Sequence, residues 1–400
     1  MPSLRVLSYL ASSHSPLLNP DRNPALHYVL RKTFYAQFCA GETSLEVKRT
    51  VRGLKDLGFR GVMLTYGKEN VLKKGEHVDP VQADPNSTNG EEKMEDIEDI
   101  EAWKEGTLKT VGMADDSDFV ALKFSGAGNT AIQQLSSRQQ PNPRIDTAIT
   151  EICDLAESKG VRLLFDAEQN AIQDGVDCWT LMFQRRYNRK TPIVYGTYQA
   201  YLRSISSTLT KHLLAAQRDG FILGVKLVRG AYMASDPRHI FWHSKEFTDR
   251  AHDGIMEALL ERQWNKALSE PKKGAQFPAV DLVVASHNEH SVRKALEIQE
   301  RQRAINKDEV DVAYGQLMGM ADEVSCALVA HKENMRPDRH DGDPDLSAKV
   351  YKYVVWGSVR ECLKYLVRRA EENRDAVTRA EGTRLALRRE LLRRLGLTTS

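Results

Sequence analysis

The sequence predicts an α/β protein of the (β/α)8 class, and three observations support that prediction. Apolar, β-branched runs occur eight times along the chain, and a stretch with helical spacing follows each of them. Strands buried on both faces of a parallel sheet give such runs, and eight strands with helices between them are the element count of a barrel. With 400 residues and 41% hydrophobic side chains, the chain suffices for one large domain with appendages or for two ordinary domains.

The expected strands share a second feature, which is a polar or ionisable residue at or near the carboxyl end. In chain order the expected strands are 61–67, 118–126, 162–168, 192–201, 222–230, 281–288, 310–317 and 349–357. The polar residues at their ends are Lys123, Asp166, Glu168, Gln199, Lys226, Arg229, His287, Asn288, Gln316 and Tyr353. In a barrel the carboxyl ends of the strands converge on one mouth, where the active sites of this fold lie. The pattern therefore predicts a site at that mouth.

Three segments need a separate interpretation. Residues 1–58 contain two amphipathic helical stretches and are expected to pack on the barrel of residues 59–400. Residues 79–118 hold thirteen acidic residues and three lysines, which is typical of a solvated insertion, with a partner-docking role as the alternative. From residue 374 onward an Arg-rich helical pattern places an apolar stripe beside a basic one. Such a helix either caps the barrel or rests on an anionic bilayer surface.

Composition and charge disfavour several classes of protein. The 57 basic and 55 acidic residues leave a formal charge of +2, too small for phosphate-backbone binding, so no nucleic-acid partner is expected. Five scattered cysteines without a CxxC pair suggest neither a disulfide framework nor a zinc cluster and indicate a reducing compartment. No run approaches the roughly 18 to 20 apolar residues of a membrane span. The first twenty residues carry one arginine and no acid, a weak transit-peptide signal; a frayed or truncated start is the alternative.

Other chemistries are disfavoured by spacing. Gly126, Gly128 and Ala131 approach a dinucleotide fingerprint, but the next strand-end acid stands about 40 residues further on, where about 20 are expected. Asp166, Glu168, His287 and His290 are the residues that could be combined into a metal-ligand set. Their spacing does not match that of known metal sites, so no metal is expected. The chain has no GxSxG elbow and no cysteine at a strand end, which disfavours acyl transfer.

The strongest local constellation is YLVRRAEEN, residues 365–373. Two adjacent guanidinium groups, from Arg368 and Arg369, can form bidentate bonds to one carboxylate, and Glu372 can orient one of them. A surface helix with salt bridges is the alternative for any RRxxE sequence. Because this segment follows the eighth expected strand, which carries Tyr353, the helix can overhang the barrel mouth.

The strand-end motifs, taken in order, resemble those of the proline dehydrogenases, flavoenzymes that oxidise L-proline to 1-pyrroline-5-carboxylate. The matching segments are LKFSG, FDAEQ, YGTYQAYL, VKLVRGAYM, ASHN, YGQLMGMAD, KYVVWG and YLVRRAEEN, and they extend over roughly residues 26–396. LRKTFYAQFCAGE and ELLRRL resemble the eukaryotic mitochondrial, monofunctional branch. The resemblance implies a distorted (β/α)8 barrel with FAD on its mouth, a quinone as electron acceptor, and a peripheral place on the matrix side of the inner mitochondrial membrane.

The resemblance also implies a role for each matching residue. Arg368 and Arg369 would grip the carboxylate of proline, with Glu372 as their partner acid. The expected catalytic set is Lys123, Asp166 and Lys226. The walls of the substrate pocket would be Tyr353, Leu317, Ala231 and Tyr232. The FAD contacts would be Gln199, Lys226, Val228, Gly230, His287 and Asn288.

The implied reaction transfers hydride from C5 of proline to flavin N5, because the clamped carboxylate would hold the ring in that geometry. A cation such as Lys123 would help to keep the substrate amine neutral, and Lys226, where many bacterial members have arginine, would stabilise negative charge on the reduced flavin. The sequence KYVVWGS lacks two prolines common in eukaryotic members, but Tyr353 is kept, which favours proline as substrate. A hydroxyproline dehydrogenase and a non-catalytic amino-acid-binding barrel are the alternatives.

Overall fold

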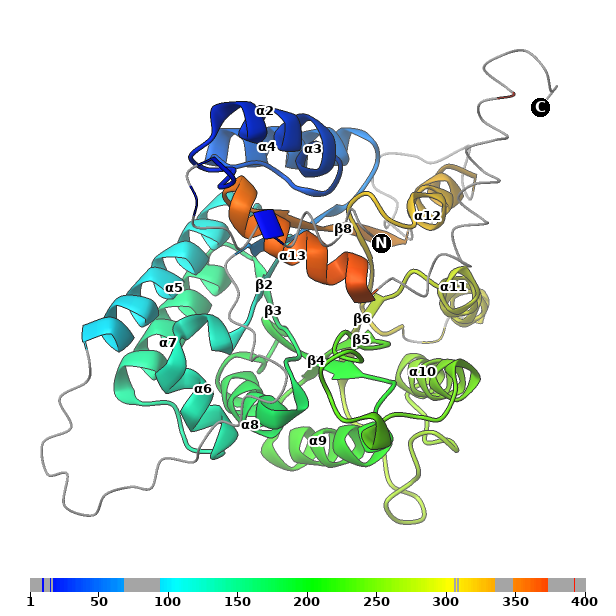
Figure 1. Ribbon diagram of the computed structural model, residues 1–400. Coiled ribbons are helices and arrows are strands. Elements are labelled where there is room, and N and C mark those ends of the chain that lie inside the picture. The colour runs from blue at the N-terminus through cyan, green and yellow to red at the C-terminus, as the bar shows by residue number, and fades with distance from the viewer. Residues whose placement is uncertain are drawn as a thin grey trace, which may run out of the picture.

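A computed structural model shows a closed ring of eight parallel strands surrounded by helices (Figure 1). The structure describes residues 9–10, 15, 17–67, 94–305, 307, 309–334, 348–372 and 392. The strands are β1 (Gly61–Tyr66), β2 (Phe119–Leu122), β3 (Arg162–Phe165), β4 (Val194–Gln199), β5 (Leu223–Val228), β6 (Val280–Ala285), β7 (Val312–Leu317) and β8 (Lys349–Trp356). Each strand pairs with the next, and β8 pairs with β1. The eight strands and the barrel expected from the sequence are confirmed.

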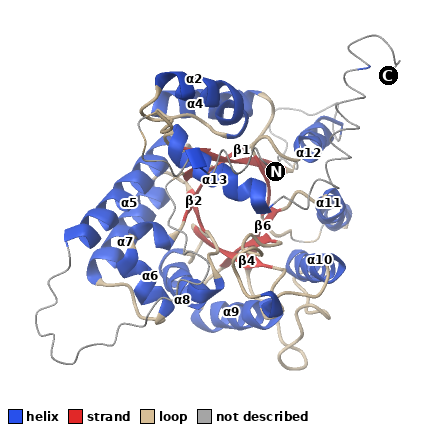
Figure 2. Cartoon of the chain, in the orientation of Figure 1, coloured by secondary structure: helices blue, strands red, loops and turns tan. Residues whose placement is uncertain are grey.

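Helices form an outer layer around the strands (Figure 2). Those that connect consecutive strands are α5 (Met94–Met113), α6 (Asn129–Ser136), α7 (Pro143–Ser158), α8 (Asn170–Tyr187), α9 (Ile205–Asp219), α10 (Lys245–Glu261), α11 (Glu289–Ala304) and α12 (Asp322–Asn334). Short 3-10 turns η2 (Phe124–Ala127) and η3 (Arg238–Ile240) precede α6 and α10. After β8 the chain enters α13 (Val359–Glu372), which Figure 2 shows across the ring of strands. Because α13 starts soon after β8 ends, its first turn lies at the carboxyl ends of the strands, and from there the helix runs across the ring (Figure 2).

Side chains fill the interior of the barrel. The Phe119 ring makes edge-on contacts with the rings of Tyr195 and Tyr351, with ring centres 5.6 Å and 5.1 Å away. The Arg162 guanidinium lies 3.8 Å from the centre of the Phe119 ring and donates a 2.8 Å hydrogen bond to the Tyr351 hydroxyl. These residues come from the first half of their strands, so they close the barrel at its amino end and leave the carboxyl end as the place for a site.

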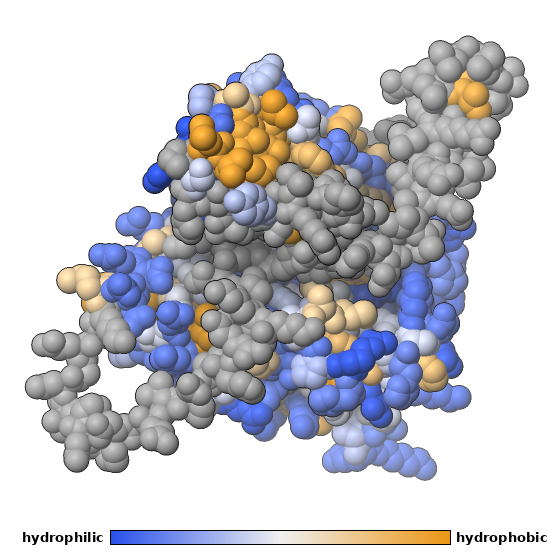
Figure 3. Space-filling model, in the orientation of Figure 1, coloured by the Kyte–Doolittle hydropathy of each residue, from blue (hydrophilic) through white to orange (hydrophobic). Residues whose placement is uncertain are grey.

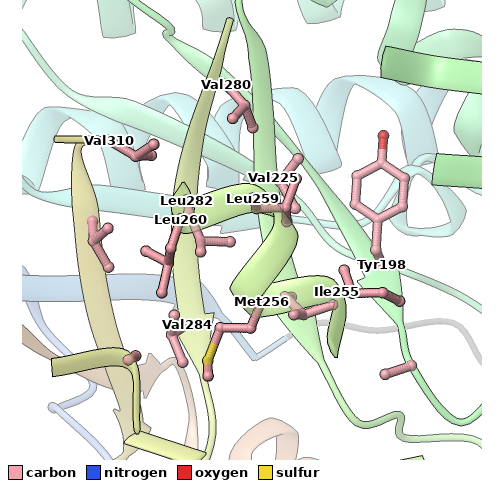
Figure 4. Packing of buried hydrophobic residues seen from close by; sticks show 14 of the residues in the cluster. Tyr198, Val225, Ile255, Met256, Leu259, Leu260, Val280, Leu282, Val284 and Val310 are labelled. Atoms are coloured by element: carbon pink, nitrogen blue, oxygen red, sulfur yellow. The ribbon is translucent and has the colours of Figure 1, made fainter. Parts of the chain in front are cut away.

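The largest apolar cluster lies outside the barrel, between the strands and the helices that cover them. Figure 4 shows part of it, where side chains of α10 such as Ile255 and Leu259 face Val225 of β5 and Leu282 of β6. All four are essentially inaccessible to solvent. Truncating one of them to alanine would cost about 2–5 kcal/mol, so this layer fixes α10 firmly against the strands.

The acidic segment differs in part from the expectation of a solvated insertion at 79–118. Its described part, 94–118, is mostly α5, which connects β1 to β2. Ile100, Trp103 and Val111 are buried at helical spacing, whereas Glu95 and Glu98 are exposed. The acids of α5 lie toward the outer face of a helix whose inner face packs on the barrel, whereas Asp118, beyond the helix, is buried. The high density of charge hid this apolar face in the sequence.

The glycines after β2 serve close packing against α5. A Cβ on Gly126 would lie 2.6 Å from Trp103 Cδ1, and one on Gly128 would lie 2.8 Å from Asp99 Cβ. Gly128 also has a φ of 93°, which favours glycine. These contacts give both glycines a packing role.

The first described part of the chain is helical, as expected. It comprises α2 (Pro24–Leu30), one π-helical turn η1 (Arg31–Tyr35), α3 (Ala36–Phe38) and α4 (Ser44–Asp56). Figure 3 shows apolar residues gathered over these helices, and exposed large apolar side chains in this part of the chain include Leu17, Val29 and Leu45.

Two further findings concern only the described residues. None of their helices is both long and apolar enough to cross a membrane. Within the same residues, no group of three or more His, Cys, Asp or Glu side chains is arranged to hold a metal ion.

Candidate active site

Asp166, Lys226 and Tyr353 meet at the carboxyl end of the barrel. The Lys226 ammonium lies 2.6 Å from Asp166 Oδ1, and the Tyr353 hydroxyl donates a hydrogen bond to Asp166 Oδ2 over 2.8 Å. The Lys226 Nζ atom also lies 4.9 Å from the centre of the Tyr353 ring. Thr197 adds a long contact of 3.5 Å to Oδ1. One carboxylate thus joins residues from three separate strand ends.

Strand alternation explains why these side chains point inward. Successive side chains of a strand point to opposite faces, so residues two apart share a face. Tyr351 lies in the barrel interior, and Tyr353 follows it by two positions; Leu164 and Asp166 are related in the same way. β3 and β8 each therefore supply an apolar or aromatic residue deep in the barrel and a polar residue at its mouth.

The pKa of the Tyr353 phenol is raised well above its ordinary value of 10. Burial is the largest cause, and the negative charge of Asp166 adds to it, because both oppose formation of a phenolate. Tyr353 is therefore a phenol at neutral pH and acts as a hydrogen-bond donor. Its ring is held in one orientation by a fixed acceptor.

Lys123 approaches the same end of the barrel from β2. Its Nζ atom lies 5.9 Å from the centre of the Tyr232 ring, and the Tyr232 hydroxyl donates a 3.2 Å hydrogen bond to the carbonyl of Ala167. The segment after β5 consequently packs over the segment after β3. A second link joins the two segments, because the Asn170 amide donates to both oxygens of Asp236 at 3.1 Å and 3.2 Å.

Gly230 and Gln199 shape the segment that follows β5. The Ala231 amide donates a 3.2 Å hydrogen bond to Gln199 Oε1, which ties this segment to the end of β4. Gly230 has a φ of 142°, and a Cβ at this position would overlap the ring of Tyr201. Glycine is therefore required here both by the backbone conformation and by the space available. Val228, the last residue of β5, accepts the Ala200 amide at 2.8 Å.

His287 and Asn288 follow β6. His287 Nε2 accepts a 3.1 Å hydrogen bond from the amide of Leu317, the last residue of β7, so in the neutral ring the proton is assigned to Nδ1. Asn288 Oδ1 accepts the Ser291 amide at 3.2 Å and starts α11. The two residues thus connect the carboxyl ends of β6 and β7 with the start of α11.

Sequence reasoning gave Arg229 no role beyond its strand end, and its contacts are extensive. Its guanidinium donates to Asp249 Oδ1 at 2.8 Å, to Ser286 Oγ at 2.7 Å and to Ser291 Oγ at 2.8 Å. The Ser286 hydroxyl also accepts the Asn288 amide at 3.1 Å. Arg229 thereby connects the segment after β5 to the segment after β6. Its partners lie 20 to 62 positions further along the chain. The sequence shows that they are acidic or carry a hydroxyl group, but not that they contact Arg229.

Gln316 was grouped with the strand ends at the mouth, and the structure contradicts this placement. Its amide donates to the Ser286 carbonyl at 3.2 Å and accepts the Ser325 hydroxyl at 3.1 Å. Ser325 belongs to α12, which covers the outside of the barrel. Gln316 points outward because it stands next to Leu317, and neighbouring residues on a strand face opposite sides.

Arg368, Arg369 and Glu372 lie on α13, whose backbone is helical to Glu372. Their side chains fall outside the described part of the structure. The start of α13 is well defined: the Ser358 amide donates to Glu361 Oε2 at 3.0 Å, and the Glu361 amide donates to Ser358 Oγ at 3.3 Å. This reciprocal pair is a capping box, which fixes where the helix begins.

Comparison with known proteins gives one family for this chain. The sequence profile described as "Proline dehydrogenase" matches residues 47–381. "Probable proline dehydrogenase, mitochondrial" of Schizosaccharomyces pombe is 28% identical over 91% of this chain and 80% of its own. "Hydroxyproline dehydrogenase" of Rattus norvegicus is 26% identical over 92% of this chain and 83% of its own.

The structural comparison concerns the fold. The crystal structure of proline utilization A (PutA) from Bdellovibrio bacteriovorus inactivated by N-propargylglycine has a TM-score of 0.66 and 16% identity. The match covers 93% of this chain and 36% of the PutA chain. This chain therefore corresponds to about a third of that larger protein.

Proposed function

This chain belongs to the proline dehydrogenase family, and from that premise we propose that it oxidises L-proline to 1-pyrroline-5-carboxylate with FAD as its cofactor. The observation that carries the proposal is the shared carboxylate of Asp166, which holds both Lys226 and Tyr353 at the mouth of the barrel. A buried ammonium group at this place would stabilise the negative charge that develops on a flavin as it is reduced.

The donor set at the mouth suits a flavin nucleotide. Lys226 places a buried ammonium group there, and His287, whose Nε2 accepts the Leu317 amide, adds an imidazole ring. Gly230 brings main chain to the surface of the mouth without a side chain. Cations, imidazole N–H and exposed backbone are the groups that flavin carbonyls, ribityl hydroxyls and phosphates accept from. Gln199, Val228 and Asn288 complete the set that would hold the cofactor.

Each remaining residue would act on the substrate. Arg368 and Arg369 would bind the carboxylate of proline as a bidentate pair, with Glu372 as their partner acid. The Lys123 ammonium would lower the pKa of the substrate amine, because two neighbouring positive charges repel, and a neutral amine can give up hydride. Bound FAD supplies the two-electron acceptor.

The pocket walls would determine how the ring sits. Tyr353 and Leu317 are paired in the register between β8 and β7, so their side chains enter the mouth side by side. Tyr232 and Ala231 close the opposite side from the segment after β5. With water excluded by these apolar groups, the interaction of Lys226 with developing negative charge would be strengthened.

Location and partners follow from the same premise. The S. pombe relative is named as mitochondrial, which supports a mitochondrial location for this chain. We further propose a quinone as the electron acceptor and a peripheral contact with the inner membrane on its matrix side. The division into residues 1–58 and a barrel of residues 59–400 remains a prediction.

Hydroxyproline is the second candidate substrate, because a relative that spans most of this chain is named a hydroxyproline dehydrogenase. The orientation of Tyr353 favours proline. Its hydroxyl is held by Asp166, so the ring cannot swing aside to admit a substituent on C4 without losing that hydrogen bond.

An anaerobic titration tests the proposal. The purified protein, reconstituted with FAD, is mixed with L-proline or with trans-4-hydroxy-L-proline while its visible spectrum is recorded. Bleaching of the flavin bands at lower concentrations of proline is the expected result. Preferential bleaching by hydroxyproline would transfer the function to the second candidate, and a protein that cannot bind FAD would overturn both.

A further inference from the structure

The start of α13 is held by two carboxylates from the first part of the chain. The Arg360 amide donates to Asp21 Oδ1 at 3.2 Å, and the Val359 amide donates to Glu42 Oε1 at 3.3 Å. Asp21 Oδ2 also accepts the Ser358 hydroxyl at 3.0 Å. The first amides of a helix have no partner within it, and negative charge at this end is favourable. Asp21 and Glu42 therefore supplement the capping box of α13 from more than 300 positions away.

The same part of the chain also packs against the apolar side of α13. Leu30, Tyr35 and Cys39 share an apolar cluster with residues of α13 such as Val359 and Leu363. Tyr35 donates its hydroxyl to the Gly357 carbonyl at 2.8 Å. The contact therefore combines hydrogen bonds at the helix start with apolar packing along its side.

Glu42 is itself held by an imidazole ring and a guanidinium group. His27 Nε2 and Arg31 Nη1 lie 3.2 Å and 3.4 Å from Glu42 Oε2, which leaves Oε1 for the Val359 amide. Arg31 also pairs with Glu46, and the Glu42 amide donates to Glu46 Oε2 at 3.0 Å. Because its contacts hold the Glu42 carboxylate in one place, the carboxylate fixes the position of the Val359 amide in addition to supplying negative charge.

Geometry carries the effect along the helix. Nine residues separate Val359 from Arg368, which at 1.5 Å per residue is about 14 Å. A tilt of about 4° at the start of α13 would displace the far end by roughly 1 Å, which is enough to impair a positioned reaction. We propose that Asp21 and Glu42 are positioning residues, which set the place of Arg368 and Arg369 over the barrel mouth by fixing the start of α13. The inference rests on the proposed function, in which these arginines bind the substrate carboxylate.

The test compares Asp21→Asn, Glu42→Gln and their double variant with Asp56→Asn, an exposed acid on α4. Proline is measured against pyrrolidine, which has the ring and the amine but no carboxylate, either as a substrate or as a competitive inhibitor. We expect the double variant to raise the KM for proline about tenfold, since each cap contributes modestly. The binding of pyrrolidine, the flavin spectrum and kcat should change by less than about twofold, and Asp56→Asn should match the parent protein.

Hydrogen exchange supplies a readout that does not depend on turnover. In the double variant, amides 359–367 should exchange faster, whereas those of α10 should not change. An unaltered KM together with unaltered exchange would overturn the inference. Equal losses for proline, pyrrolidine and FAD would assign Asp21 and Glu42 to stability alone and would also overturn it. If the double variant does not fold, each single variant gives the same comparison. Failure of the parent protein to oxidise proline would instead overturn the proposed function.

Discussion

Tyr353 donates its hydroxyl to Asp166 Oδ2 over 2.8 Å, across 187 positions of sequence. The bond spans the mouth of the barrel from β8 to the end of β3. Because Lys226 occupies the other oxygen of the same carboxylate, moving any one of the three residues disturbs the other two.

Tyr353→Phe keeps the ring and removes this hydrogen bond. We expect kcat/KM for proline to fall at least about tenfold, because a hydrogen bond to a charged group contributes about 1.5–3 kcal/mol. Steady-state kinetics with an artificial electron acceptor measure the change. Tyr351→Phe is the matched control, since Tyr351 lies two residues earlier on β8 with its hydroxyl bonded to Arg162 at the closed end. Equal kinetic effects of the two substitutions would contradict the assignment.

Gly230→Ala tests the backbone at the candidate flavin site. The new Cβ would overlap the Tyr201 ring at a φ of 142°, so we expect a loss of at least about 2 kcal/mol in the free energy of unfolding. We also expect weaker retention of FAD, measured by dialysis and absorbance. Gly274→Ala is the control: its φ is 80°, but no atom lies within 4 Å of the added Cβ. If both variants retain FAD equally, the crowding at Gly230 has no part in cofactor binding.

Arg229→Gln leaves the Asp249 and Asp253 carboxylates without their shared cation. Burial acts to raise the pKa of Asp253, but hydrogen bonds from His252 and Ser291 and the charge of Arg229 bring it below its ordinary value. A lowered pKa stabilises the folded state above the unfolded pKa, and this stability is lost as the pH falls through the folded pKa. The variant should therefore lose about 2–4 kcal/mol at pH 7 and clearly less at about pH 2.5, below the ordinary pKa of an Asp carboxyl group. Urea unfolding at the two pH values measures the difference.

The exposed Arg218 provides the comparison for Arg229. Arg218→Gln should leave the urea midpoint unchanged at both pH values, because Arg218 lies in solvent beside Asp219. A constant deficit of Arg229→Gln from about pH 2.5 to pH 7 would show that its ion pairs do not carry the effect.

Asp281→Asn should stabilise the protein at neutral pH. Burial, with a contribution from the charge of Asp311, raises the pKa of Asp281 to about 6. A carboxyl group with a raised pKa favours the folded state while it is protonated, and this contribution is lost as the pH rises through the folded pKa. The substitution should thus add on the order of 1–3 kcal/mol at pH 7.5 and little at about pH 3, below the ordinary pKa of an Asp carboxyl group. Thermal unfolding at both values checks this; a gain of the same size at about pH 3 would exclude titration of Asp281 as its cause.

The repeated strand pattern could be predicted from the sequence because burial on both faces leaves long apolar runs. Asp166, Lys226 and Tyr353 could be placed at one mouth for the same reason, since parallel strands end together. Gln316 was misplaced because a strand end alone does not reveal the face to which a side chain points. The apolar face of α5 was missed because its acids dominated the local composition.

Contacts between distant segments could not be predicted from the pattern of residues. Nothing near Arg229 in the sequence indicates Ser286 or Asp249 as its partners. Likewise, Asp21 and Glu42 look like ordinary surface acids until α13 lies beside them. Such pairs depend on how the helices pack around the barrel, and this packing is set by many side chains at once.

The closed ring has a consequence for how the chain is made. β1 is paired with β8 over six positions, from Gly61 with Tyr351 to Tyr66 with Trp356. More than three quarters of the chain must therefore be synthesised before β1 can pair with β8. Until then β1 and β7 each expose a row of unpaired backbone groups, which are sites for aggregation. A nascent chain of this protein would need protection by chaperones longest at its earliest strand.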